Sequence, residues 1–227
     1  LQNHRITIII GVPRLYEGFK KSIKAKINAS GVGRNLLKLS LKVGNLGFSR
    51  KLFGKVQRGF GGEVRYMVCG GSKLDPDTAL FFRALGFDIL EGYGMTEAAP
   101  MITFTRPRAF KVDSAGQHLS VTTIKIQDDE ITASGPNIMK GYFRRPDETA
   151  EVLRNGWLYT GDLGHLDDNG HLFVTGRRKE ILVLGSGKNI NPVEIEQVLE
   201  SLDPLVAEAA VTVVDDRLHA VIRPEKV

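Results

Sequence analysis

Cysteine is nearly absent from this sequence, since Cys69 is the only one among 227 residues. An internal disulfide is therefore excluded, and a single thiol fits a reducing compartment, so we expect a cytoplasmic protein. Long apolar runs are also absent, because none approaches the roughly 20 residues that a helix needs to cross a bilayer. The five histidines are scattered without the spacing of metal ligands, which gives a zinc site little support.

Acidic residues are nearly absent from residues 1–62, which contain one acid, Glu17, and 13 Lys and Arg. The charge balance is +12 in this stretch and −7 in the remainder, which gives the net charge of +5. Three interpretations of the basic stretch stay open: a solvated helix face, contact of residues 14–58 with an anionic membrane on its cytoplasmic side, or a helical lid over an apolar tunnel. Aromatic residues are few there and show no stacking pattern, so nucleic acid is not favoured as a partner.

The apolar pattern of the first 60 residues indicates a strand followed by helices. Residues 6–10 are a β-branched run typical of a buried strand, and Pro13 begins an amphipathic helix with apolar residues every four positions from Leu15. We expect Gly31 and Gly33 to break this helix. Two further basic helices are expected at residues 36–43 and 50–60.

A strand, a helix and a second strand follow. Residues 64–69 read as a strand, Asp75 and Pro76 are the capping acid and first-turn proline of a helix, and residues 88–90 form the next strand. This alternation predicts a parallel α/β layer that binds ligands at the carboxyl ends of its strands.

The second half of the chain reads as mostly β. Residues 121–126 and 130–133 alternate as strands do, and Asn169-Gly170 between two apolar runs predicts a tight hairpin. Beyond Glu180 we expect a small separate unit. Its elements are a strand at 181–184, a helix at 193–201, and strands at 209–214 and 219–222.

Two polar clusters flank the predicted hairpin. Asp162 follows Gly161 at an expected strand end, and Arg177 lies one hairpin later. A carboxylate beside a guanidinium suits a neighbouring pair of hydroxyls such as a ribose diol, because the acid accepts two hydrogen bonds and the arginine fixes the approach. The plain alternative is an exposed Asp-Arg pair, which contributes little to stability.

A third cluster, Glu91-Gly92-Tyr93-Gly94-Met95-Thr96-Glu97, directly follows a predicted strand. Glycines let the main chain approach a ligand closely. Tyr93 offers a flat face for a base, Thr96 a hydroxyl for a phosphate oxygen, and Glu97 a hard oxygen ligand for Mg²⁺. The alternative is a loop around a core tyrosine.

Together these clusters resemble the adenylate-forming enzymes, which include acyl-CoA synthetases, nonribosomal-peptide adenylation domains and luciferases. The resemblance rests on Tyr-Gly-x-Thr-Glu from Tyr93, Thr-Gly-Asp from Thr160, Gly-Arg-x-Lys from Gly176, and Gly-Lys-Asn-Ile-x-Pro from Gly187. The stretch Gly70-Gly71-Ser72-Lys73-Leu74 resembles the adenine-side loop of the family. Residues 135–142 resemble another family motif, which we interpret as scaffold more than chemistry.

The resemblance implies an α/β fold: α/β layers with a small β subdomain, followed by the start of a small mobile α+β C-terminal domain. Residues 1–178 would be the C-terminal part of the large AMP-binding domain, and residues 179–227 a truncated small domain with its hinge near Lys179. The family's phosphate loop should precede residue 1, and its catalytic lysine should follow Val227. We therefore expect a fragment that is inactive alone.

The resemblance also implies a two-step reaction with ATP, Mg²⁺ and coenzyme A, in which an acid becomes acyl-AMP and is then transferred to the thiol. The implied nucleotide-binding residues are Gly71, Ser72, Tyr93, Gly94, Thr96, Asp162 and Arg177. The implied catalytic residues are Thr96, Glu97 and Lys179, with Glu97 also the metal ligand. The implied coenzyme A-side loop is Gly185, Ser186 and Gly187.

A further resemblance indicates which class of carboxylic acid is the substrate. Residues 11–17 and the basic helices before Gly70 look like those of bacterial long-chain fatty acyl-CoA synthetases, which implies a fatty acid as substrate. Two alternatives stay open: a ligase that loads an acyl-carrier protein, and a catalytically inactive nucleotide-binding module.

Overall fold

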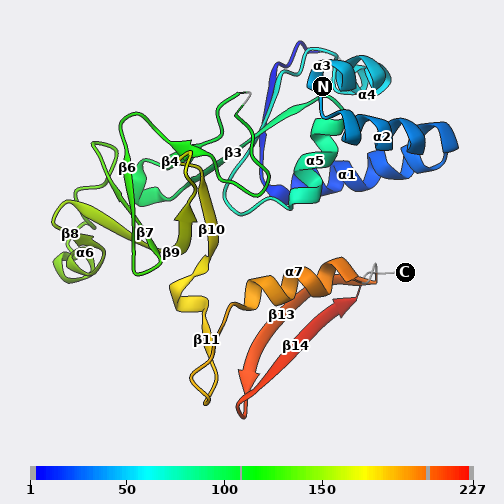
Figure 1. Cartoon of the computed structure of the whole chain (residues 1–227). Helices are drawn as coiled ribbons and strands as arrows, with labels where there is room; N and C mark the ends of the chain where they lie inside the picture. Colours follow the sequence, from blue (N-terminus) through cyan, green and yellow to red (C-terminus); the bar gives the residue numbers. More distant parts are fainter. Residues whose placement is uncertain (1–3, 108, 203–204, 225–227) are drawn as a thin grey trace.

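The computed structural model describes residues 4–107, 109–202 and 205–224. A helical group and a mixed sheet form one end, a second sheet lies beside them, and toward the C-terminus one helix at residues 192–202 packs on a hairpin at residues 206–224 (Figure 1). Among these described residues, no helix is both long and apolar enough to cross a membrane.

The first sheet begins with three parallel strands, and the parallel layer predicted from residues 64–90 is present in β2 and β3. Its strand order is β1-β2-β3-β4-β5, with β4 and β5 antiparallel to their neighbours. The strands are β1 (Ile8–Gly11), β2 (Tyr66–Cys69), β3 (Asp88–Gly94), β4 (Met101–Phe104) and β5 (Gln117–His118). The strand β3 runs further than the expected residues 88–90, so Tyr93 lies on a strand and not in a loop.

The expectation of a fully buried first strand is wrong. Ile10 is 78% exposed and Ile8 is 50% exposed, because β1 lies at the edge of the sheet and only Ile9 faces the core. The buried Tyr16 fixes this edge, since its hydroxyl donates to the carbonyl oxygens of Ile9 (3.0 Å) and Val68 (2.8 Å).

Five helices pack beside the parallel strands. They are α1 (Pro13–Asn28), α2 (Gly31–Val43), α3 (Leu46–Leu52), α4 (Gly54–Gly59) and α5 (Pro76–Ala84). The glycines at 31 and 33 lie in the first turn of α2 and do not form a longer break, because the Ser30 hydroxyl accepts from the Gly33 amide and caps the helix. The single helix expected at 50–60 is divided into α3 and α4.

The second sheet has the order β10-β9-β7-β6 and is antiparallel throughout. Its elements are β6 (Thr123–Gln127), β7 (Glu130–Ser134), β8 (Leu153–Arg154), β9 (Trp157–Leu166) and β10 (Leu172–Arg177), with α6 (Pro146–Val152) beside β8. The predicted hairpin at Asn169-Gly170 joins β9 to β10. A short 3₁₀ turn, η1 (Thr96–Ala98), lies between β3 and β4 of the first sheet.

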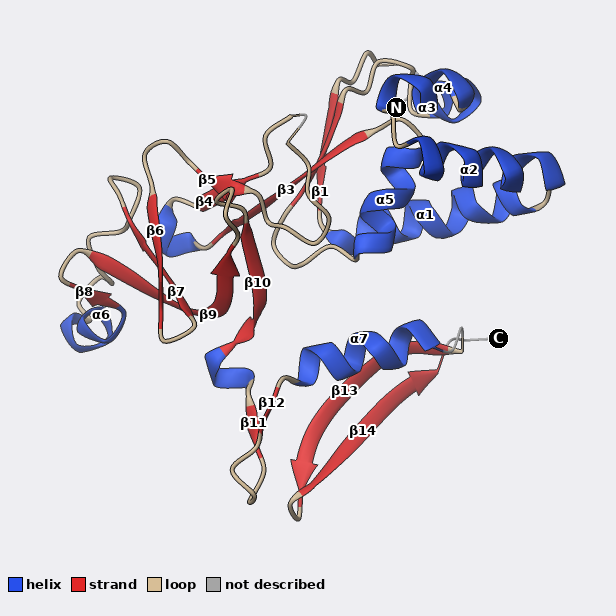
Figure 2. Ribbon diagram, in the orientation of Figure 1, coloured by secondary structure: helices blue, strands red, loops and turns tan. Residues whose placement is uncertain are grey.

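The last part of the chain packs mainly on itself (Figure 2). It consists of η2 (Arg178–Glu180), β11 (Leu182–Val183), β12 (Asn189–Ile190), α7 (Pro192–Leu202), β13 (Val206–Val214) and β14 (Arg217–Pro224). Acidic side chains of α7 join it to β13: Glu196 accepts from the Val211 amide (2.7 Å) and Glu200 from the Ala209 amide (2.9 Å). The predicted helix and the strands expected at 209–214 and 219–222 are present with wider bounds, whereas the strand expected at 181–184 is limited to Leu182–Val183.

Candidate functional site

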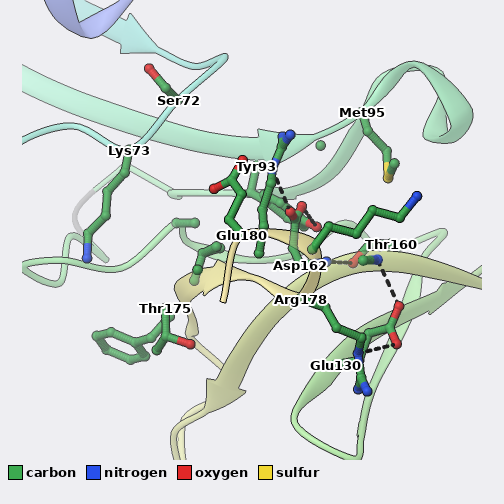
Figure 3. A pocket seen from close by; sticks show the side chains of 18 of the residues that line it. Ser72, Lys73, Tyr93, Met95, Glu130, Thr160, Asp162, Thr175, Arg178 and Glu180 are labelled. Carbon is green, nitrogen blue, oxygen red and sulfur yellow. Dashed lines mark hydrogen bonds and ion pairs between the residues drawn. The ribbon is translucent and has the colours of Figure 1, made fainter. Parts of the chain in front are cut away.

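Three residues from different elements meet at one cavity (Figure 3). Tyr93 comes from β3, Asp162 from β9 and Arg177 from the end of β10. The Tyr93 hydroxyl donates to Asp162 Oδ2 at 2.7 Å, and Arg177 Nε lies 3.0 Å from Asp162 Oδ1. The cavity has a volume of about 1220 Å³. The phenol, acid and guanidinium therefore converge as the sequence predicts.

Asp162 is nearly buried, with 7% of its surface exposed. Its carboxylate offers about four lone-pair positions, of which Tyr93 and Arg177 take two. Burial, and next the nearby Asp162 carboxylate, raise the pKa of Tyr93, so its hydroxyl stays protonated and donates. Two acceptor positions of Asp162 remain for a ligand that carries neighbouring hydroxyls.

Asp162 lies on a bulge inside β9, so its expected position at a strand end is wrong. Thr132 pairs with Tyr159 and Glu130 with Leu163, which leaves residues 160–162 opposite Ile131 alone. Gly161 has φ +75°, a conformation that glycine adopts without strain. The bulge turns the Asp162 side chain toward the cavity.

Most of the other predicted nucleotide-binding residues line the same cavity. Gly71, Ser72 and Gly94 are among its lining residues, whereas Thr96 is not. Of the residues predicted as catalytic, Lys179 lines the cavity and Glu97 does not. The 3₁₀ turn η1, which carries Thr96 and Glu97, directly follows the cavity-lining Gly94 and Met95. Their roles remain predictions.

The motif at residues 135–142 holds the η1 turn in place. The side-chain amide of Asn137 donates to the carbonyl oxygens of Ala98 (3.1 Å) and Met101 (2.9 Å). The main-chain amide of Met139 donates to the Glu97 carbonyl oxygen (2.8 Å). The Tyr142 hydroxyl donates to Glu97 Oε1 at 2.7 Å and its side chain lines the cavity. These contacts agree with the scaffold interpretation, and Tyr142 also lines the cavity.

The donor set at Glu97 fits Mg²⁺ bound mainly through phosphate. Within the described parts of the chain, no group of three or more His, Cys, Asp or Glu is placed to hold a metal ion. Mg²⁺ keeps several waters and is commonly bound by one or two carboxylates together with substrate phosphates. Glu97 provides one carboxylate, whose Oε1 already accepts from Tyr142.

The loop at Gly185, Ser186 and Gly187 does not line the cavity. It forms the turn between β11 and β12, closed by hydrogen bonds from the Leu184 amide to Lys188 (3.1 Å) and from the Gly187 amide to Leu184 (2.7 Å). The predicted role of this loop toward coenzyme A remains a prediction.

The sequence motifs assign no role to three charged residues at the site. Glu91 lines the cavity with 8% of its surface exposed, and burial raises its pKa to about 7. Glu130 and Arg178 also line the cavity and lie 3.3 Å apart. Glu91 was detectable as an acid next to the apolar strand residues 89 and 90, whereas the other two depend on a long-range pairing.

Residues 1–143 match the AMP-binding enzyme family. This match covers more than half of the chain. The chain therefore belongs to the AMP-binding enzyme family.

Curated relatives include acyl-CoA ligases that act on different acids. The long-chain-fatty-acid–CoA ligase FadD15 of Mycobacterium bovis is 31% identical over 90% of this chain and 37% of its own length. The 2-succinylbenzoate–CoA ligase of a Geobacillus species is 39% identical over 68% of this chain and 35% of its own length. The chain thus spans little more than a third of these relatives.

Solved structures agree with the fold. The O-succinylbenzoate coenzyme A synthetase of Bacillus subtilis in complex with AMP has a TM-score of 0.72 and 29% identity, over 99% of this chain and 42% of that chain. The same enzyme solved with ATP and magnesium ion has a TM-score of 0.70 and 30% identity, over 97% of this chain and 42% of that chain. The adenylate-forming fold is therefore confirmed.

Proposed function

We propose that the protein, expressed from its whole open reading frame, is an AMP-forming acyl-CoA ligase. It joins a carboxylic acid to the α-phosphate of ATP with release of pyrophosphate, and then transfers the acyl group to the thiol of coenzyme A with release of AMP. The chain spans little more than a third of its relatives, so this activity belongs to the complete protein.

The observation that carries the proposal is the convergence of Tyr93, Asp162 and Arg177 on one cavity. The Tyr93 ring provides a face for adenine, and the two unused acceptor positions of Asp162 suit the ribose hydroxyls. Arg177 fixes the carboxylate in its orientation. This combination suits a nucleoside better than a simple surface ion pair, because Asp162 is nearly buried.

The remaining predicted residues serve three purposes: binding of the phosphates, movement of the small domain and approach of the thiol. Thr96 would donate its hydroxyl to a phosphate oxygen, and Glu97, whose carboxylate accepts from the Tyr142 hydroxyl, would hold Mg²⁺. When bound, the metal neutralises the charge that develops around phosphorus. Lys179 lies in η2, where a change in backbone angles would turn residues 179–227 between the two half-reactions. Gly185, Ser186 and Gly187 would then line the approach of the thiol.

We propose a long-chain fatty acid as the substrate. The fatty-acid ligase relative aligns over 90% of this chain and the 2-succinylbenzoate ligase over 68%, although the latter has the higher identity. The longer alignment supports the fatty acid.

The test is acid-dependent ATP–pyrophosphate exchange and thioester formation with the complete protein. A long-chain fatty acid, acetate, 2-succinylbenzoate and ferulate are compared at equal concentrations, with coenzyme A and an acyl-carrier protein as alternative acceptors. We expect at least roughly tenfold higher kcat/KM for the long-chain acid, because each methylene group that binding removes from water adds to the hydrophobic stabilisation. Equal or faster reaction of an aromatic acid would overturn the substrate assignment, and no exchange with any acid would overturn the ligase.

We also propose that residues 14–58 contact anionic membrane. On α2, the exposed apolar residues Val32, Leu39 and Val43 lie beside the exposed Lys38 and Lys42. A basic surface with apolar side chains beside it favours anionic lipid, and such contact would bring the enzyme close to its fatty acid.

A further inference from the structure

The bulge in β9 leaves one main-chain amide without a partner in the sheet. Residues 160–162 have only Ile131 opposite them, so the amide of Gly161 cannot pair in the ladder. The Glu130 side chain supplies the missing acceptor, since its Oε1 receives the Gly161 N–H at 2.8 Å (Figure 3). Glu130 therefore fixes the residue that precedes Asp162.

The second oxygen of Glu130 is also occupied. Arg178 Nε lies 3.3 Å from Glu130 Oε2, and Arg178 Nη2 donates to the Asp128 carbonyl at 2.7 Å. The side chain of Glu130 is only 12% exposed. Because both of its oxygens have partners within the protein, Glu130 is better placed to hold the main chain than to bind a ligand.

Two adjacent arginines thus contact the two acids next to Gly161. One acid is Asp162, which follows Gly161 in the chain, and the other is Glu130, which accepts from the Gly161 amide. Arg177 pairs with Asp162, and Arg178 pairs with Glu130. Both arginines lie where β10 passes into η2, the segment that leads to Lys179. The position of this segment is therefore tied to the shape of the bulge and not only to Asp162 itself.

We propose that Glu130 is a positioning residue for the ribose-binding carboxylate of Asp162, acting through the Gly161 amide, and that Arg178 keeps Glu130 in that position. The inference rests on the proposed function, because it takes the ribose hydroxyls as the ligand of Asp162. It assigns Glu130 no direct contact with the nucleotide.

The test compares binding of AMP and of 2′,3′-dideoxy-AMP to the complete protein by titration calorimetry, which needs no turnover. The affinity for AMP divided by the affinity for 2′,3′-dideoxy-AMP measures the contribution of the ribose hydroxyls, because the two nucleotides differ only in these groups. Glu130→Ala should lower this ratio roughly five- to tenfold, because Asp162 loses its fixed orientation. Glu130→Gln should stay within about twofold of wild type, since its amide oxygen still accepts from Gly161.

Arg178→Ala should lower the ratio by about twofold to threefold, because Glu130 keeps Gly161 but loses its own support. The matched control is Glu148→Ala, which breaks the exposed pair of Glu148 and Arg145 (2.8 Å) and should leave the ratio unchanged. Hydrogen exchange of the Gly161 amide should quicken in Glu130→Ala and remain slow in Glu130→Gln.

Equal weakening of both nucleotides by Glu130→Ala, or the same loss in Glu130→Gln, would overturn the inference while leaving the proposed function intact. If Glu130→Ala does not fold, an Arg178→Ala ratio equal to that of Glu148→Ala would overturn the inference in the same way. A wild-type protein that binds the two nucleotides equally would instead overturn the proposed ribose site, and the inference with it.

Discussion

Asp162 shows how one buried charge is made tolerable at a ligand site. Its carboxylate is nearly closed off from water but receives hydrogen bonds from Tyr93 and Arg177. Buried charges are stable only when they are paired and hydrogen-bonded. Because the pairing leaves acceptor positions free, the same arrangement that stabilises the charge also prepares it for hydroxyls.

Asp162→Ala in the complete protein should weaken AMP binding by roughly ten- to a hundredfold, because hydrogen bonds to a charged group contribute about 1.5–3 kcal/mol. Titration calorimetry measures the change. Asp168→Ala is the control, since Asp168 lies in the hairpin turn beyond the site. Unchanged affinity in Asp162→Ala would remove Asp162 from the nucleotide site.

Glu91 is a second buried acid, and its environment is less favourable to charge. Burial raises its pKa from 4.5 to about 7, a hydrogen bond from the Leu74 amide lowers it, Asp113 raises it and Lys73 lowers it. Between pH 4.5 and 7 the unfolded chain is ionised at this position while the folded chain keeps the proton. The stability from Glu91 is therefore complete below pH 4.5 and is lost as the pH rises through 7.

Glu91→Gln should consequently gain stability relative to wild type as the pH rises, by about 3 kcal/mol at most between pH 5 and pH 8. Urea unfolding of both proteins at the two pH values measures this difference. The exposed Glu148→Gln serves as the control and should show no such trend. A constant difference between Glu91→Gln and wild type across this range would mean that Glu91 is ionised throughout.

At the scale of single elements, α5 begins at a cap that also joins two helices. The Asp75 carboxylate accepts from the amides of Asp77 (3.3 Å) and Thr78 (2.9 Å), and Lys20 of α1 reaches it at 3.0 Å. Burial alone would raise the pKa of Asp75, but the hydrogen bonds from Thr78 and Lys20 outweigh it and lower the pKa.

Asp75→Ala should destabilise the protein by about 1–2 kcal/mol, the usual loss for an N-cap, and lower the Tm measured by calorimetry. The cap's stability is present above the ordinary pKa of Asp75 and falls as the pH drops through the lowered value, so the Tm difference should shrink in acid. Asp77→Ala changes the same turn without removing the cap and should have a smaller effect. Equal Tm values for both variants would argue against the cap.

The elements that the sequence predicted well are those with local signals. The Asp75-Pro76 start of α5, the parallel pairing of β2 with β3 and the hairpin at Asn169-Gly170 all follow from patterns in nearby residues. The bulge at Gly161 could not be predicted this way, because it depends on how β7 pairs with β9 some 30 residues later. The contacts of Glu130 depend on that same register.

At the scale of the whole molecule, the site is assembled from parts that are distant in the chain. Tyr93 comes from the mixed sheet, Asp162 from the antiparallel sheet, and Val193 and Glu194 of α7 complete the lining. The family motifs predicted which residues would meet but not the surfaces around them. The exposed β1 edge, with Ile10 open to solvent, was one feature that the β-branched pattern could not distinguish from a buried strand.

Charge is also distributed at this scale, because 13 Lys and Arg stand against Glu17 in the first 62 residues. If residues 14–58 contact anionic membrane, the complete protein should sediment with phosphatidylserine-containing vesicles and not with neutral ones. Raising the salt concentration should release it, since screening shortens the range of surface charges. Reversing Lys38 and Lys42 together to Glu should weaken vesicle binding at least roughly tenfold, because each basic residue near the surface contributes about 1 kcal/mol.

The control reverses Lys140 and Lys188, which are exposed but lie outside the basic helices, and so makes the same change in net charge. This variant should bind vesicles as the wild type does if the α2 surface is the contact. Equal loss in both variants would show that overall charge, and not the helical surface, drives binding. If vesicle binding changes neither with salt concentration nor with the reversal of Lys38 and Lys42, the basic helices are solvated surface and not the membrane contact. An electrostatic contact must weaken in both experiments.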